Sequence, residues 1–375
     1  MTTMNVLVTH IQHNSKWIAL AISFALGLLL VTAIEGQEPV TNGEFLPEFS
    51  LELSTDSSDQ VVLTQARCRK NKPVCVSGSD EVWLVSARNS HLAPYDLSAL
   101  EVSRLENSKW IKSDIDELVQ RHTIDKTRVT MLYAHGNRTD LGWATSRGLQ
   151  FYENSLLNTG VDRPPVRFVL FAWKSEAEQL RPLPDFDVKS ARSVILGHTF
   201  GSLLSQFHDR DMVLCGFSLG AQVVLSGLAN PELQYTPNVG RYKVALFAAA
   251  LDSTHPRSDL TELPYNSIVE QTEVFVNRDD RAVKAAQWIN RRRAPSCTTT
   301  LRQLAGLGFN VPNRIHINDV TDQVSKRHSI VGYGLAPKTH RGLADLLFSF
   351  YTSTPVAQPA VGLAPACMDS LIPAN

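Results

Sequence analysis

The chain has 375 residues, 43% of them hydrophobic, and its 36 Lys and Arg nearly balance its 37 Asp and Glu. This length supports one core of roughly 250 to 300 residues with appended segments. A formal net charge of -1 provides no long-range field to attract a polyanion, which argues against nucleic acid as a partner.

The N-terminal segment has the pattern of an export signal. Lys16 precedes an uncharged apolar run from Trp17 to Ile34, and Val31-Thr32-Ala33 provides a small-residue cleavage site. The run is at the short limit for a membrane-spanning helix and longer than a usual signal-peptide core. We therefore predict a signal peptide or a membrane anchor over residues 1–36. Both readings export the rest of the chain to the periplasm, the medium or the outer face of a membrane, with attachment through residues 17–34 if the segment is retained.

Five cysteines fit an exported protein. Cys215 lies in an apolar strand and is predicted to be a buried free thiol, which leaves an even set. In that set a local bridge between Cys68 and Cys75 and a longer one between Cys297 and Cys367 are the expected pairing, and four free thiols are the alternative. No Cys-x-x-Cys spacing is present, so no metal site is expected.

Four regions follow from the pattern of composition along the chain. Residues 37–79 are predicted to be a tether that ends in the Cys68/Cys75 loop, residues 80–352 a catalytic domain, and residues 353–375 a Pro/Ala-rich tail. Inside the domain, a first strand over Glu81–Arg88 and a short capped helix over Ser113–Gln120 are expected.

Beyond residue 128, short apolar runs alternate with helical stretches. The runs predicted as buried parallel strands are Val129–Ala134, Val166–Trp173, Met212–Phe217, Lys243–Leu251, Glu273–Asn277 and Arg314–Val320. The predicted helices are Asp140–Leu157, Val188–Phe207, Leu219–Leu228, Arg281–Asn290 and Arg341–Tyr351. This alternation predicts an α/β fold in which a mostly parallel central sheet has helices on both faces, and no insertion is large enough for a lid.

The most informative motif is Gly216-Phe217-Ser218-Leu219-Gly220. An apolar strand leads into Ser218, and a helical pattern starts directly after it, which is the context of a nucleophile elbow. The two glycines are expected because strand and helix approach too closely for side chains, and the tight turn strains the backbone at the serine. The pattern therefore predicts Ser218 as a nucleophile.

A serine nucleophile needs a base and an acid, which follow it in that fold in the order acid, then histidine. His328 lies in a polar loop after the last predicted strand, whereas His316 lies inside that strand and His340 begins the final helix. His328 is therefore the predicted base, and the other two histidines are read as structural.

Two aspartates compete for the acid that orients the imidazole. Asp280 follows the strand before the histidine, and Asp252 follows the strand before that. Asp280 is favoured over Asp252, and its neighbour Asp279 is the weaker choice.

An oxyanion hole needs two backbone N–H groups directed at the developing charge. Leu219, directly after the nucleophile, is expected to provide one. The loop His135-Gly136-Asn137-Arg138 follows a strand, so Gly136 can allow close approach and Asn137 is the predicted second donor.

These segments together resemble the α/β-hydrolase superfamily over roughly residues 80 to 352. The segments Val169-Leu-Phe-Ala-Trp-Lys-Ser and Phe217-Ser-Leu-Gly-Ala-Gln are similar to those of secreted lipases, a likeness that implies Asp252 as the acid. The segments Asn277-Arg-Asp-Asp-Arg-Ala and Arg327-His-Ser-Ile look more like an uncharacterised bacterial family of predicted esterases, which implies Asp280.

The leading functional hypothesis is a carboxylic-ester hydrolase that acts through an acyl-enzyme on a small-molecule or lipid-like ester and needs no cofactor. An amidase or peptidase with the same triad is the alternative, since the sequence identifies the nucleophile and not the leaving group. A non-catalytic binding module on the same fold is the third reading, and it requires a broken triad. The sequence does not indicate an oligomeric state.

Overall fold

The computed structural model describes residues 67–68, 72–73, 76–90, 95–125, 127–159, 161–178, 182–207, 212–231, 233, 242–250, 268–284, 315–324 and 326–353. The predicted export segment, nearly all of the predicted tether, Cys75, Cys297, Cys367 and the tail beyond residue 353 lie outside these ranges, so neither proposed cysteine pair is described. Asp252 and most of the helix predicted over Arg281–Asn290 lie outside them as well.

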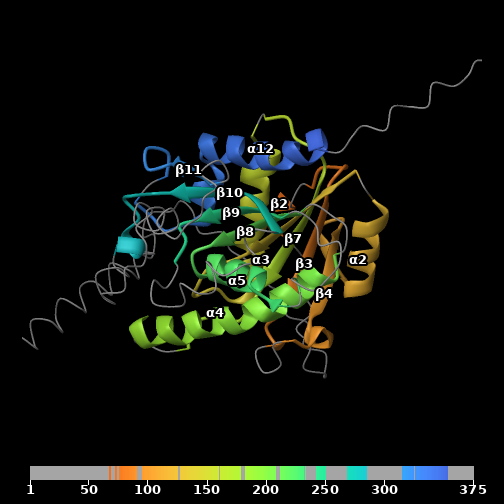
Figure 1. Cartoon of the computed structure of the whole chain (residues 1–375), viewed down its shortest axis with the longest axis horizontal. Helices are drawn as coiled ribbons and strands as arrows, with labels where there is room; N and C mark the ends of the chain where they lie inside the picture. Colours follow the sequence, from red (N-terminus) through yellow and green to blue (C-terminus); the bar gives the residue numbers. More distant parts are fainter. Residues whose placement is uncertain are drawn as a thin grey trace, which may run out of the picture.

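A nine-stranded sheet forms the centre of the described fold, in the order β11-β10-β9-β8-β6-β7-β3-β4-β5 (Figure 1). Its strands are β3 (Glu81–Ser86), β4 (Glu101–Glu106), β5 (Lys109–Ser113), β6 (Val129–Ala134), β7 (Val166–Ala172), β8 (Met212–Phe217), β9 (Tyr242–Phe247), β10 (Val269–Val276) and β11 (Ile315–Asp319). All neighbours from β11 to β3 pair in parallel. The mostly parallel sheet predicted from the alternating pattern is thus confirmed.

Two antiparallel hairpins lie outside the predicted parallel set. β4 pairs with both β3 and β5, and the turn between β4 and β5 has positive φ at Asn107 (49°) and Ser108 (64°). A turn with positive φ at two consecutive residues matches the right-handed twist of the strands in a tight hairpin. A second, small hairpin joins β1 (Arg67–Cys68) to β2 (Lys72–Pro73). The β4–β5 hairpin is not predicted from the sequence, because both strands are partly exposed and carry few apolar residues.

Helices cover both faces of the sheet. They are α2 (Ile115–Ile124), the short η2 (Leu97–Ala99), α3 (Leu141–Tyr152) with its one-turn extension η3 (Glu153–Leu157), α4 (Pro182–Ser205), α5 (Leu219–Leu228), α11 (Ile330–Gly334) and α12 (Pro337–Ser353). One buried apolar cluster joins the sheet to α3, α11 and α12, and the other joins it to α2, α4 and α5. In Figure 1, α12 and α4 accordingly lie on opposite sides of the strands.

The alternation of β6, α3, β7, α4, β8, α5 and β9 places every strand of the centre between two apolar layers. The central strands β6, β7, β8 and β9 are buried along their whole length, which explains why their sequences are mostly apolar. Among the described residues, no helix has both the length and the apolar character needed to cross a bilayer. Ser218, Asp280 and His328, which were predicted to act in catalysis, lie beyond the carboxyl ends of β8, β10 and β11.

Candidate active site

Ser218 lies in the turn between β8, which ends at Phe217, and α5, which begins at Leu219. Its backbone has φ 54° and ψ -122°, a combination that L-residues rarely adopt and that stores about 1–3 kcal/mol of strain. Hydrogen bonds hold this conformation on both sides: Ser218 N–H donates to Phe247 O at 3.0 Å, and Ala250 N–H donates to Ser218 O at 3.1 Å. The central strands therefore fix the serine in the sharp turn that the motif predicted.

The two motif glycines are required by the closeness of strand and helix. A Cβ on Gly216 would lie 2.5 Å from Cα of Ala221, and one on Gly220 would lie 2.2 Å from the carbonyl oxygen of Ala134. Both contacts are with backbone atoms, so no rotation of a side chain could relieve them. The spacing of the glycines is thus explained by packing at the elbow.

His328 and Asp280 meet in a hydrogen bond of 2.8 Å between Nδ1 and Oδ2. Asp280 follows β10 and its side chain is 1% exposed, while His328 follows β11 and its side chain is 23% exposed. The other carboxylate oxygen of Asp280 accepts hydrogen bonds from the N–H groups of Ala282 (3.0 Å) and Val283 (3.1 Å). Asp280 is therefore buried and fixed, and the imidazole of His328 that it contacts stays partly accessible.

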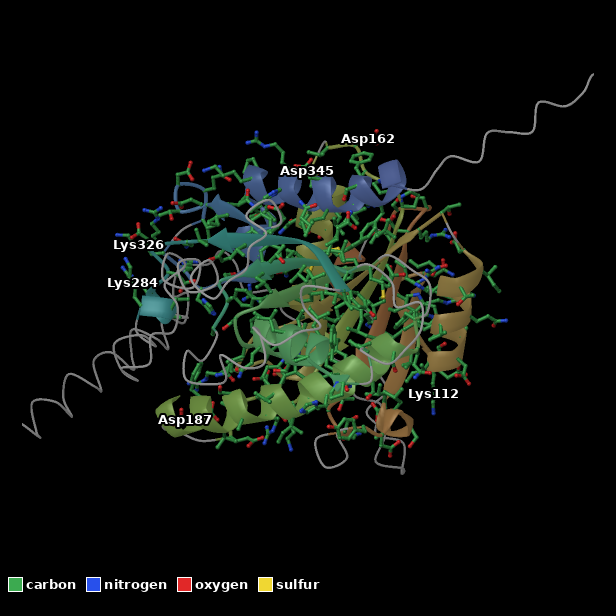
Figure 2. All side chains as sticks on the ribbon, in the orientation of Figure 1. Lys112, Asp162, Asp187, Lys284, Lys326 and Asp345 are labelled. Atoms are coloured by element: carbon green, nitrogen blue, oxygen red, sulfur yellow. The ribbon has the colours of Figure 1, made fainter. Side chains whose placement is uncertain are left out.

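The loops that carry these two side chains are joined through their backbones. Arg281 N–H donates to Lys326 O at 3.3 Å. In Figure 2 the labelled Lys284, in the helical turn that follows Asp280, and the labelled Lys326, two residues before His328, lie on the same side of the molecule. The neighbouring Asp279 instead forms an ion pair with Lys284 at 3.0 Å and has a half-exposed side chain. Of the two adjacent aspartates, only Asp280 contacts the histidine.

The imidazole of His328 also lies beside the elbow. Its ring centroid is 4.7 Å from that of Phe217, the residue before Ser218, with an angle of 31° between the rings. The two other histidines near the end of the domain have different partners. His316 pairs with Glu273 at 2.7 Å, and Nε2 of His340 donates to Gly334 O at 2.8 Å. Both contacts agree with the structural roles expected for them.

The loop after β6 is organised by His135. Its Nδ1 lies 2.8 Å from the carbonyl oxygen of Gly136, and its Nε2 lies 3.1 Å from the backbone N–H of Trp173. A carbonyl can only accept and an N–H can only donate, so the ring is neutral and carries its proton on Nδ1. Trp173 Nε1–H donates in turn to His135 O at 2.7 Å. Both ring nitrogens of His135 are thus occupied by contacts with the backbone.

Two backbone N–H groups next to Ser218 have no partner in the described part of the chain: those of Leu219 and Asn137. A Cβ on Gly136 would lie 3.1 Å from Cβ of Ser218, which measures how close the loop comes to the nucleophile. Since the peptide group is planar and trans, the bond from His135 to Gly136 O turns the N–H of Asn137 the opposite way. Unpaired N–H groups at this position are what an oxyanion hole needs.

The stability of the protein should fall between pH 6.5 and about pH 4 because of His135. Burial lowers the pKa of this imidazole from 6.5 to about 4. Between these two pH values the imidazole is protonated in the unfolded chain and neutral in the folded chain. The contribution of neutral His135 to the free energy of unfolding is fully present above pH 6.5. It is lost as the pH falls through 4, by about 3 kcal/mol in total. Urea unfolding from pH 7 to pH 4 would measure it. His135→Asn should flatten the slope, and parallel curves for the two proteins would contradict the prediction.

A comparison with protein families finds a match over residues 112–322, which is more than half of the chain, to the family described as alpha/beta hydrolase of unknown function (DUF900). The chain belongs to this DUF900 family. The match includes the elbow, the loop after β6 and Asp280, and it ends before His328. The hydrogen bond between His328 and Asp280 is therefore an observation independent of the family match.

No curated protein matches this DUF900 chain. Among solved structures, it is similar to a lipase-esterase related protein from Clostridium acetobutylicum, with 13% identity, 60% of this chain and 95% of that chain covered, and a TM-score of 0.30. It is also similar to a Trichoderma reesei cutinase in complex with a phosphonate inhibitor, with 13% identity, coverage of 63% and 84%, and a TM-score of 0.27. The fold assignment therefore rests on the family match and on the strand order.

The DUF900 chain has supporting residues at this site that were not predicted from its sequence. Phe217 contacts His328, and Trp173 and Ser175, which follow β7, contact the loop after β6. The segment after β7, Trp173-Lys-Ser, was the available signal, but its contact with the loop after β6 depends on which strands are adjacent. Within the described ranges, no group of His, Cys, Asp and Glu could hold a metal ion.

Proposed function

We propose that this protein is a serine hydrolase that cleaves carboxylic esters with Ser218, His328 and Asp280. The observation that carries the proposal is the 2.8 Å hydrogen bond between His328 and the buried Asp280, formed beside an elbow whose serine is held at φ 54°. A serine hydroxyl becomes nucleophilic when a histidine, itself oriented by a carboxylate, removes its proton. The family membership supports hydrolysis as the reaction class.

In the proposed mechanism, Ser218 Oγ attacks the ester carbonyl and its proton passes to Nε2 of His328. Asp280 keeps the other proton on Nδ1 and stabilises the imidazolium. The N–H groups of Leu219 and Asn137 donate to the oxyanion of the tetrahedral intermediate. The C–O bond then breaks, the alcohol leaves with the proton from His328, and water hydrolyses the acyl-enzyme by the same steps.

The same residues could cleave amides, so the leaving group needs its own test. We expect the full-length protein to hydrolyse p-nitrophenyl esters of short acids with a higher kcat/KM than the matching p-nitroanilides. An anilide rate equal to or above the ester rate would favour the amidase reading. A folded protein that hydrolyses neither class would contradict the enzyme proposal and favour a binding module on this fold.

We also propose that the catalytic domain acts outside the cytoplasm, as a secreted protein or attached through residues 17–34. The support is the apolar run from Trp17 to Ile34, which follows Lys16. Protease added to intact cells should degrade the retained form, and N-terminal sequencing of the protein from the medium or periplasm should identify the cleaved one. Full protection of the domain inside intact cells would exclude export.

A further inference from the structure

We infer that Ser175 is a positioning residue for catalysis: its buried hydroxyl clamps the oxyanion loop so that Asn137 N–H stays directed at the substrate oxygen. This inference rests on the proposed function. Ser175 lies in the loop after β7, and β7 is the strand that pairs with β6. The residue is 0% exposed. A fully buried hydroxyl is normally satisfied by hydrogen bonds, and the partners of this one are all in a single loop.

The hydroxyl of Ser175 contacts the loop after β6, here called the oxyanion loop (residues 135–139), near both of its ends. Its Oγ lies 3.0 Å from Gly136 O and 3.1 Å from Thr139 O, so its proton is shared between two carbonyls. The same oxygen accepts a hydrogen bond from Thr139 N–H at 3.2 Å. These contacts bracket Asn137 and Arg138, the two residues in the middle of the loop.

The segment between these hydrogen bonds has a strained backbone. Arg138 has φ 55°, a region that costs a residue with a side chain about 1–3 kcal/mol unless the surroundings enforce it. Thr139 Oγ1 donates to Asn137 O at 3.0 Å inside the bracket. If the hydroxyl of Ser175 were removed, the loop would lose its contacts at Gly136 and Thr139. The backbone strain at Arg138 would then favour other conformations of the loop.

The clamp acts on the peptide group that bears the oxyanion donor. Gly136 O is held from two sides, by His135 Nδ1–H at 2.8 Å and by Ser175 Oγ at 3.0 Å. Because the peptide is planar, a fixed carbonyl fixes the N–H of Asn137 on its other side. A donor that is oriented before the reaction stabilises the transition state more than one that must reorganise. Ser175 has this effect although it does not touch the substrate.

The test compares full-length wild type with Ser175→Ala, Ser175→Cys and a control, Ser155→Ala. Ser155 is also buried, and its hydroxyl donates to Phe151 O at 2.6 Å outside the site, so it reports the loss of an ordinary buried hydroxyl. Each protein is assayed for kcat and KM on a p-nitrophenyl ester. Its inhibition constant for an alkyl boronic acid, which mimics the tetrahedral intermediate, is also measured, together with thermal unfolding.

We expect Ser175→Ala to lower kcat about tenfold with KM within about twofold, and to weaken boronic acid binding by the same factor as kcat/KM. The loss is smaller than the roughly 10²–10³-fold effect of deleting an oxyanion donor, because the donor remains and only its orientation loosens. Ser175→Cys should fall between wild type and Ser175→Ala, since a thiol is a weaker donor. Ser155→Ala should stay within about twofold of wild type in both kcat and inhibition.

Wild-type kcat and inhibition in folded Ser175→Ala would overturn the clamp, as would an equal loss in Ser155→Ala. If Ser175→Ala does not fold, the cysteine variant decides, and wild-type values in that protein overturn the inference. A wild-type protein without ester turnover would overturn the proposed function, and the clamp with it. Wild-type turnover with unaffected serine variants would overturn the clamp alone.

Discussion

Replacing Ser218 with alanine should lower kcat for an ester by a factor on the order of 10⁶, to the level left by binding and the oxyanion donors alone. The proposed mechanism has no other nucleophile, since His328 and Asp280 act only through the serine. The fold should persist, because the bonds that hold the elbow are made by the Ser218 backbone to Phe247 and Ala250. Steady-state kinetics and thermal unfolding would measure the two quantities.

Ser226→Ala is the matched control for this change, since it removes a hydroxyl from α5, the helix that begins directly after Ser218. It should leave kcat within about twofold. Residual activity of a tenth or more in pure Ser218→Ala would mean that another group carries the reaction, and the elbow would then be only a packing feature.

Changing Asp280 to asparagine should lower kcat about 10⁴-fold while the structure is retained. One carboxylate oxygen of Asp280 accepts two backbone N–H bonds, from Ala282 and Val283. The asparagine oxygen must take that position, so its NH₂ group faces Nδ1 of His328. The imidazole then becomes an acceptor at Nδ1 and carries its proton on Nε2, where it can no longer accept one from Ser218. The loss should appear in kcat rather than in KM.

Two further aspartate variants make this result specific. Asp279→Asn should have little effect, because Asp279 pairs with Lys284 at the surface. Asp252→Asn should also retain most activity if Asp280 is the acid. A large loss in Asp252→Asn together with a small one in Asp280→Asn would reverse the assignment, in agreement with the lipase-like reading of the sequence.

The central elements were predictable because their residues satisfy local and global preferences together. β6, β8 and α5 have the predicted boundaries, and each is a short apolar segment between clear turn signals. The helix predicted from Ser113 begins instead at Ile115, with Asp114 as its N-cap, because Ser113 belongs to β5. The β4–β5 hairpin was missed because its partly exposed strands lack the apolar run on which strand prediction depends.

The candidate site was predictable only in part, and the difference has a physical cause. The elbow lies in one continuous segment, so the spacing of Gly216, Ser218 and Gly220 was sufficient. The acid depends on which loop reaches the histidine, and both Asp252 and Asp280 follow a strand in the required order. Ser175 and Trp173 contact the oxyanion loop only because β6 and β7 are neighbours in the sheet, which a linear pattern does not contain.

Labelling with a fluorophosphonate, followed by mass spectrometry of the peptides, tests the central claim most directly. The reagent phosphonylates a serine only where a base and an oxyanion hole activate it. We predict one modified residue, Ser218, in wild type, and much slower labelling in Asp280→Asn. A folded protein that remains unlabelled, or that is labelled at another serine, would contradict the assignment of Ser218 as the nucleophile.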